Sequence, residues 1–147
     1  MTCIDLFDEA LHIPAEFTHD LVSATIDTWK VFQHNTQQFR DRIDVRRGPS
    51  GEILRQLVIN AYDFVYIDGA HDSYHVLEDS VLAFQVVKPG GLLLWDDYEW
   101  NVPGLSPASF QHPRPAIDAF LHIYAEKVAL VHQGYQVCIQ KRPEITF

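Results

Sequence analysis

The chain is poor in cysteine, in basic residues and in long apolar runs, and each shortage excludes a class of protein. Its two cysteines, Cys3 and Cys138, lie near opposite ends of 147 residues without a CxxC pair, which excludes a disulfide framework and a thiolate zinc site. The 11 Lys and Arg against 20 Asp and Glu give a formal charge of -9, so nucleic acid is not expected as a partner. No apolar run approaches the roughly 20 residues that span a bilayer, so no membrane contact is expected.

Signal and motif features of several other classes are also missing. The chain starts with MTCIDLFDEA, which is acidic where a secretory signal is basic. Together with the few cysteines, this predicts a cytoplasmic protein in a reducing compartment. The sequence contains no GxSxG, HExxH or GxxxxGK(S/T), and so has no serine-hydrolase elbow, zinc-protease helix or phosphate loop.

Apolar and aromatic residues are plentiful, at 47% and 12% of the sequence, which fits one compact domain over residues 1–147. Short β-rich runs alternate with longer segments of helical spacing, a pattern typical of an α/β domain with a mostly parallel sheet. Strands are predicted at residues 2–7, 42–47, 62–68, 92–95, 128–131 and 135–141, the last two forming a C-terminal antiparallel hairpin. Helices are predicted at residues 27–39, 50–57, 73–87 and 114–126.

Local patterns refine this prediction. Leu77, Val81 and Phe84 are spaced as an apolar stripe that would cover one face of the sheet. The motif KPGG, residues 88–91, predicts a turn that ends this helix and starts the next strand. Residues 98–113, rich in proline, are expected to form an irregular loop after the carboxyl end of a strand, which is the ligand side of an open α/β sheet.

Carboxylates end three of the predicted strands. Asp5 follows TCI, Asp68 follows VYI, and Asp96 and Asp97 follow LLLW. If these strands are parallel, the acids gather along one edge of the sheet. Neighbouring carboxylates there repel each other and lose solvation, so a cation, hydrogen-bond donors or a raised pKa must compensate. A hard cation such as Mg²⁺ takes oxygen ligands and would do so; the simpler alternative is that Asp97 caps the following turn and faces water.

The stretch YDFVYIDGAHDSYHVLEDSVLAFQVVKPGGLLLWDDY, residues 62–98, resembles the second half of a class I S-adenosylmethionine-dependent methyltransferase. It most resembles the metal-dependent O-methyltransferases, which include catechol, caffeoyl-CoA and macrocin-type enzymes, through the order strand, IDGxH, helix, KPGG, strand, DDY. Upstream, TCIDLF resembles the second strand of this family, and RRGPSGEILRQL resembles the segment after its third strand. The resemblance covers about residues 2–100 and implies a Rossmann-like methyltransferase sheet.

The same resemblance implies S-adenosylmethionine as the cofactor. Asp5 would then hydrogen-bond the ribose of the cofactor, and Gly48 and Ser50 would lie beside its adenine. Gly69 is assigned to the cofactor site as well.

The resemblance also implies a divalent cation such as Mg²⁺ bound by Asp68, Asp96 and Asp97, with an oxygen pair of a small-molecule or sugar substrate completing the shell. Such a cation would ease deprotonation of a hydroxyl and hold it near the methyl carbon. Where catechol-type enzymes have a lysine base, this chain has His71, which can serve because a histidine of ordinary pKa, about 6.5, is largely neutral at pH 7. The alternative for His71 is a loop residue that hydrogen-bonds the backbone.

Other residues of the motif have simpler expected roles. His75 is expected to be an exposed helix residue. Ala70 stands where catechol-type enzymes have a tryptophan, so the packing of that ring must come from elsewhere, with Trp95, Tyr98 and Trp100 as candidates. These three aromatic residues are otherwise expected in the core or as anchors of the loop.

In this family the first strand and its glycine-rich turn begin about 20 residues before the position of Asp5. Only four residues precede Asp5 in this sequence, so both features are missing from it. We therefore expect an N-terminally truncated domain, and favour a fragment over a strand supplied by another chain and over closure of the gap with loss of the cofactor. In this family the first strand lies between the second and the fourth, so its loss would expose strand edges and allow homo-oligomers to form through them.

Three hypotheses of function follow. The leading one is metal-assisted O-methylation of a small-molecule or sugar hydroxyl. The alternative is a non-catalytic methyltransferase-like remnant that acts as an interaction or oligomerisation module. The third is a metal-assisted hydrolase that uses the same acids.

Overall fold

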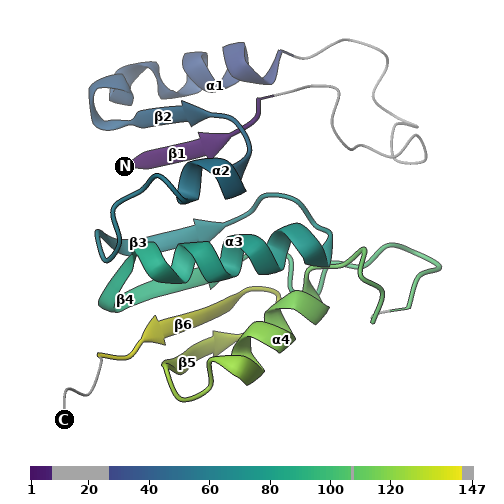
Figure 1. The fold of residues 1–147 in the computed structure, drawn as a ribbon. Helices are drawn as coiled ribbons and strands as arrows, with labels where there is room; N and C mark the ends of the chain where they lie inside the picture. Colours follow the sequence, from purple (N-terminus) through teal and green to yellow (C-terminus); the bar gives the residue numbers. More distant parts are fainter. Residues whose placement is uncertain (8–26, 107, 144–147) are drawn as a thin grey trace. The chain divides into compact units, whose positions relative to one another are not determined.

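The computed structural model describes residues 1–7, 27–106 and 108–143 of the chain (Figure 1). The chain divides into two compact units, Met1–Ser50 and Gly51–Phe147. No helix in the described ranges is both long and apolar enough to cross a bilayer. The cytoplasmic location stays a prediction.

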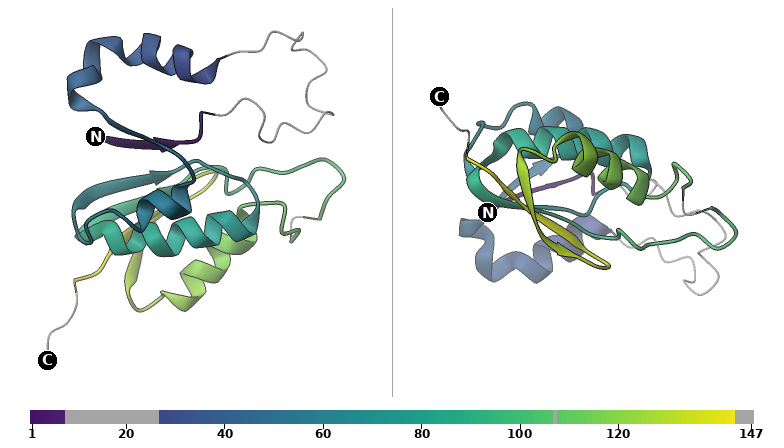
Figure 2. Two further views of the ribbon diagram at one scale, coloured as in Figure 1. Left: turned by 45° about the horizontal axis from the view of Figure 1, so that its top comes forward. Right: turned by 90° about the horizontal axis from the view of Figure 1, so that it is seen from below.

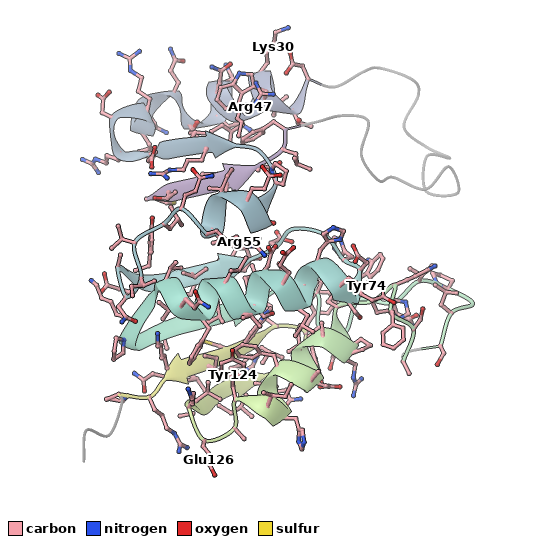
Figure 3. The ribbon with its side chains drawn as sticks, viewed as in Figure 1. Lys30, Arg47, Arg55, Tyr74, Tyr124 and Glu126 are labelled. Carbon is pink, nitrogen blue, oxygen red and sulfur yellow. The ribbon has the colours of Figure 1, made fainter. Side chains whose placement is uncertain are left out.

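The first unit contains a parallel pair of strands and two helical segments: β1 (Thr2–Asp5), α1 (Thr28–Thr36), the 3₁₀ helix η2 (Gln37–Arg42) and β2 (Asp44–Arg47). The side chain of Asp27 caps α1 by accepting a hydrogen bond from the backbone N–H of Lys30 at 2.9 Å. The rings of Phe7, Trp29 and Phe32 pack together with centroids 4.9–5.8 Å apart. The guanidinium of Arg47, labelled in Figure 3, lies 4.9 Å from the Trp29 ring centroid and adds a cation–π contact.

The second unit contains a four-stranded sheet in the order β3-β4-β6-β5. Its elements are α2 (Ser50–Leu54, which begins at the last residue of the first unit), β3 (Tyr62–Ile67), α3 (Ser73–Val86), β4 (Val87–Trp95), α4 (Arg114–Ile123), β5 (Val128–Gln133) and β6 (Val137–Lys141). β3 and β4 are parallel, whereas β6 is antiparallel to both β4 and β5. The prediction of an α/β fold with parallel strands and a C-terminal antiparallel hairpin is therefore confirmed.

Helices α3 and α4 cover one face of this sheet (Figure 2). The core between them is apolar, with Leu93, Ile117, Phe120 and Ile139 fully buried. Trp95 is also buried, and its indole N–H donates to the hydroxyl oxygen of Ser80 at 2.8 Å. This core fixes the carboxyl ends of β3 and β4.

The buried line of α3 differs from the predicted stripe. Phe84 is buried as predicted, but Leu77 and Val81 are only partly buried against the core, and Ser80 and Ala83 are fully buried. Small side chains let the helix lie close to the sheet, and the Ser80 hydroxyl satisfies the indole of the strand below. The stripe therefore lies one residue away from the predicted position.

The motif KPGG lies inside β4 rather than in a turn before it. α3 ends at Val86 and the strand begins at once, with an irregularity of register opposite Asp63. Gly90 has φ +83°, and a Cβ on Gly91 would come within 2.9 Å of the Asp63 carbonyl oxygen. The two glycines are therefore needed for the shape of the strand.

The remaining predicted elements are present with shifted ends. The predicted helix over residues 27–39 ends at Thr36 and continues as η2, and the helices predicted to end at residues 57 and 126 end at Leu54 and Ile123. Within the described residues the strands form two sheets, of two and four strands. The expected N-terminal truncation and self-association stay predictions.

Candidate active site at the carboxyl ends of β3 and β4

Three acids follow the ends of two adjacent parallel strands. Asp68 comes directly after β3, and Asp96 and Asp97 come directly after β4. The backbone N–H of Asp96 donates to the carbonyl of Ile67 at 3.0 Å and continues the pairing beyond the strands. The structure therefore brings these three acids to one edge of the sheet, as the parallel arrangement predicts. The prediction is wrong for Asp5, because β1 pairs with β2 in a separate two-stranded sheet.

A small pocket opens at this edge. Asp68, Gly69, His71, Asp96 and Asp97 line it, together with the apolar residues Ile67, Ala70, Val76, Trp95 and Pro113. The pocket thus combines carboxylates and an imidazole with an apolar wall.

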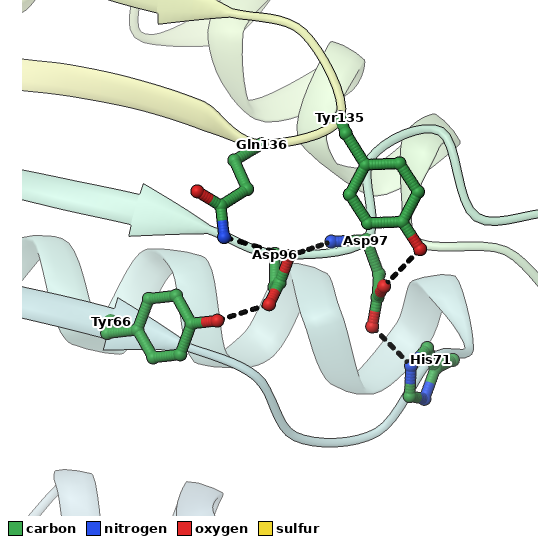
Figure 4. A network of polar contacts seen from close by, with 6 residues as sticks. All are labelled: Tyr66, His71, Asp96, Asp97, Tyr135 and Gln136. Carbon is green, nitrogen blue, oxygen red and sulfur yellow. Dashed lines mark hydrogen bonds and ion pairs between the residues drawn. The ribbon is translucent and has the colours of Figure 1, made fainter.

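Asp97 is held in a specific orientation. Its backbone has φ +57°, a left-handed conformation that non-glycine residues seldom adopt. One carboxylate oxygen lies 2.7 Å from Nε2 of His71, and the other accepts a hydrogen bond from the hydroxyl of Tyr135 at 2.7 Å (Figure 4). The Asp97 side chain thus faces the acid cluster and does not cap the following turn.

Asp96 has a separate set of donors. The hydroxyl of Tyr66 donates to one carboxylate oxygen, and the other accepts from the side-chain amide of Gln136 at 3.1 Å and from the backbone N–H of Asp97 at 2.9 Å (Figure 4). Hydrogen bonds to the ionised form, that of Tyr66 above all, hold the pKa of Asp96 below its usual value. Asp96 therefore stays ionised in spite of its acidic neighbours.

The hydrogen bonds have the opposite effect on the two tyrosines. The bond to Asp96 raises the pKa of Tyr66, and the bond to Asp97 raises the pKa of Tyr135 to about 12. Both hydroxyls therefore keep their protons at neutral pH and act as donors rather than as bases.

Asp68, His71 and Asp97 form a group that could hold a metal ion. One ligand atom from each lies within 4.8 Å of the other two. Among the described residues this group does not include Asp96, the third acid that the resemblance implies as a ligand. Burial, followed by repulsion from Asp96 and Asp97, raises the pKa of Asp68. The three acids therefore repel one another at this edge of the sheet.

His71 contacts side chains of the site. Besides Asp97, its ring contacts that of Trp100, with centroids 4.6 Å apart. No hydrogen bond from His71 to the backbone is present among the described residues. The ring is thus held between a carboxylate and an indole, and 39% of the side chain remains exposed.

Comparison with known proteins identifies the domain that carries this site. Residues 1–98 match the model of a family described as a methyltransferase domain. The chain belongs to this family. The matched residues include all the acids at the strand ends and the histidine beside them.

Individual relatives of this methyltransferase domain agree with the match. Over 71 residues the chain is 35% identical to caffeoyl-CoA O-methyltransferase 1 of Eucalyptus globulus. The aligned region covers 46% of this chain and 28% of that protein. The fold resembles an O-methyltransferase of Bacillus cereus solved with SAH, with a TM-score of 0.56 at 20% identity over 76% of this chain and 57% of the other. It also resembles MycE methyltransferase of the mycinamycin biosynthetic pathway, solved with Mg and SAH, with a TM-score of 0.52 at 19% identity over 73% and 35%. The chain thus spans less than a third of the length of the curated relative.

The cofactor residues implied by the resemblance lie in both units of the methyltransferase domain. In the first unit, Asp5 ends β1, its side chain accepts from the N–H of Phe7 at 2.8 Å, and its carbonyl accepts from the N–H of Gly48 at 3.1 Å. Ser50 begins α2. In the second unit, Gly69 lines the acid pocket. The assignment of these four residues to a cofactor stays a prediction.

The neighbouring aromatic and histidine residues have the structural roles predicted for them. Trp95 and Tyr98 are buried in the core. Trp100 lies in the loop and contacts His71. His75 is 64% exposed and bonds Asp72 at the start of α3.

The sequence prediction missed three residues, Tyr66, Tyr135 and Gln136. Tyr66 lies two residues before Asp68 on the same strand, so the alternation of a strand could have indicated it. Tyr135 and Gln136 precede β6, and only the antiparallel pairing of β6 with β4 places them beside Asp96 and Asp97. That pairing is a tertiary feature with no local signal in the sequence.

Proposed function

We propose that the chain is an S-adenosylmethionine-dependent O-methyltransferase that uses a divalent cation to methylate a hydroxyl of a small molecule. The cluster of Asp68, His71 and Asp97 ligand atoms, all within 4.8 Å, carries this proposal because it lies at the strand ends of a methyltransferase domain. The caffeoyl-CoA relatives and the SAH-bound B. cereus structure support the reaction type and the methyl donor.

The donor set fits a hard divalent cation. Asp68, Asp96 and Asp97 offer carboxylate oxygens, which Mg²⁺ prefers, and the shallow site leaves positions for water or substrate oxygens. Burial and then repulsion from Asp96 and Asp97 raise the pKa of Asp68, and a bound cation would offset that repulsion. MycE, a structural neighbour, was solved with Mg and SAH.

Within this site the residues divide the work. Asp68 and Asp97, with Asp96, would hold the cation, which when bound acidifies the acceptor hydroxyl and stabilises its charge. His71 would accept the hydroxyl proton on Nδ1, because its Nε2–H donates to Asp97, while Asp97 and Trp100 orient its ring. The acceptor oxygen then forms a bond to the methyl carbon as the bond from that carbon to the sulfonium sulfur breaks, which leaves S-adenosylhomocysteine.

The test is the formation of S-adenosylhomocysteine from S-adenosylmethionine and a catechol-bearing acceptor, with Mg²⁺ or with EDTA. We expect product only with the cation, and none with Asp97→Asn, which can keep the left-handed backbone but lacks the charge. Equal product in EDTA would refute metal assistance. No product over a panel of phenolic and sugar acceptors, together with no heat on titration of S-adenosylmethionine, would refute the activity itself.

The two other hypotheses gain no support. The comparisons do not favour a non-catalytic remnant, because the acids and the histidine are present and brought together. No relative reported above supports a hydrolase.

A further inference from the structure

We infer that Tyr66, Tyr135 and Gln136, hereafter the donor clamp, are positioning residues that hold the Asp96 and Asp97 carboxylates ready to bind the cation. This inference rests on the proposed function and deepens it. Its particular content is that cation binding depends on the C-terminal hairpin, since Tyr135 and Gln136 lie outside residues 1–98, the part that matches the family.

The donors of the clamp come from two sides of the acid pair. Tyr66 reaches Asp96 from β3, whereas Tyr135 and Gln136 reach Asp97 and Asp96 from the segment before β6 (Figure 4). The acid pair is therefore held from both sides by elements distant in the sequence. Adjacent carboxylates that repel each other would otherwise turn apart towards water.

The C-terminal hairpin is itself held in place by contacts with β4 and the loop after it. Val137 pairs with Trp95 in the sheet, and the backbone N–H of Tyr98 donates to the carbonyl of Tyr135 at 2.9 Å. The hydroxyl of Tyr98 accepts from the side-chain amide of Gln133 at 3.1 Å. The two clamp residues of the hairpin therefore have a defined position beside the acids.

The donor clamp leaves room for a cation on both carboxylates. An ionised carboxylate can accept about four hydrogen bonds, so the three donors on Asp96 leave about one position for a metal, and the two on Asp97 leave about two. Residues that hydrogen-bond metal-ligating carboxylates typically affect metal affinity 10- to 100-fold when removed. The donor clamp occupies that supporting position.

The experiment measures Mn²⁺ affinity of the full chain by the free-ion electron paramagnetic resonance signal. Tyr66→Phe and Tyr135→Phe each delete one hydroxyl and keep the ring. Tyr74→Phe is the matched control, because Tyr74 (labelled in Figure 3) is 72% exposed on α3 and its hydroxyl is not part of the donor clamp. Since Tyr66 and Tyr135 are 45% and 50% exposed, these variants are expected to fold with the melting temperature of the control.

We expect each clamp variant to bind Mn²⁺ about 10- to 100-fold more weakly than wild type, and the control to bind as wild type does. Gln136→Ala removes a third donor from the same hairpin and should weaken binding in the same direction. Wild-type affinity in both tyrosine variants would overturn the clamp while leaving the proposed function intact. If wild type itself binds no Mn²⁺, the proposed cation site and the clamp both fall.

Discussion

Replacing Asp68 by Asn should stabilise the cation-free chain and at the same time abolish its stabilisation by a cation. Carboxylate oxygens of Asp68 and Asp97 lie within 4.8 Å, so their repulsion is about 0.9 kcal/mol at the dielectric constant of water. Asp96 adds a repulsion of the same sign that is at least as large, and attraction to His71 together with screening by solvent offsets part of the total. The substitution should therefore raise the free energy of unfolding by about 1 kcal/mol, or the melting temperature by about 3 °C for a chain of this size.

The pH dependence of this gain has a definite sign. A carboxyl group whose pKa is raised in the folded state destabilises that state once it ionises, and the penalty disappears as the pH falls through the folded pKa. The gain in unfolding free energy from Asp68→Asn should therefore be complete at pH 8. It should shrink as the pH falls towards 3.8, the ordinary pKa of an aspartate.

The assay is thermal unfolding at pH 8 in EDTA and in Mn²⁺. A cation at 100 times its dissociation constant should stabilise wild type by about 2.7 kcal/mol and Asp68→Asn by far less, so the order of the two proteins reverses. The reasoning is refuted if Asp68→Asn is the less stable protein in EDTA, or if Mn²⁺ stabilises both equally.

Three further predictions concern the support of the site. Ser80→Ala leaves the buried Trp95 N–H without its partner and should cost about 1–3 kcal/mol in urea unfolding; a cost below 0.5 kcal/mol would contradict this. Asp97→Ala should be less stable in EDTA than Asp97→Asn by about 1 kcal/mol, because Asn tolerates the left-handed backbone better; equal stability would show that φ +57° carries no strain. The bond to Asp72 raises the pKa of His75 above 6.5, so its contribution, below about 1 kcal/mol, is full below pH 6.5 and is lost as the pH rises through the folded value. His75→Gln should therefore flatten the pH dependence of stability between pH 6 and 8, and an unchanged slope would contradict this.

The sequence was sufficient to predict the elements and the acid edge, because both depend on local patterns. The run YDFVYID, residues 62–68, has the β-branched and aromatic content of a strand, and parallel pairing of β3 with β4 then places Asp68 beside Asp96 and Asp97. The same run suggested a strand buried on both faces, which is wrong, because β3 is the outer strand of the four-stranded sheet and Phe64 and Tyr66 are exposed. The histidine three residues after Asp68 also lies within reach of Asp97, as the family resemblance implies.

The features that the sequence could not predict depend on tertiary contacts and on strand pairing. The buried line of α3 passes through Ser80 because an indole from β4 needs an acceptor there, and no helical periodicity encodes that need. Likewise, Tyr135 and Gln136 become site residues only through the pairing of β6 with β4. The same limit applies to KPGG, whose glycines are needed for a close approach to β3 rather than for a turn.

The central claim, that the acids at the ends of β3 and β4 hold a divalent cation, is tested most directly by counting bound Mn²⁺ per chain by electron paramagnetic resonance. We predict one bound ion per wild-type chain, displaced by excess Mg²⁺, and none in Asp68→Asn at the same concentrations. An absence of bound ion in wild type, or a bound ion that persists in Asp68→Asn, would contradict the account.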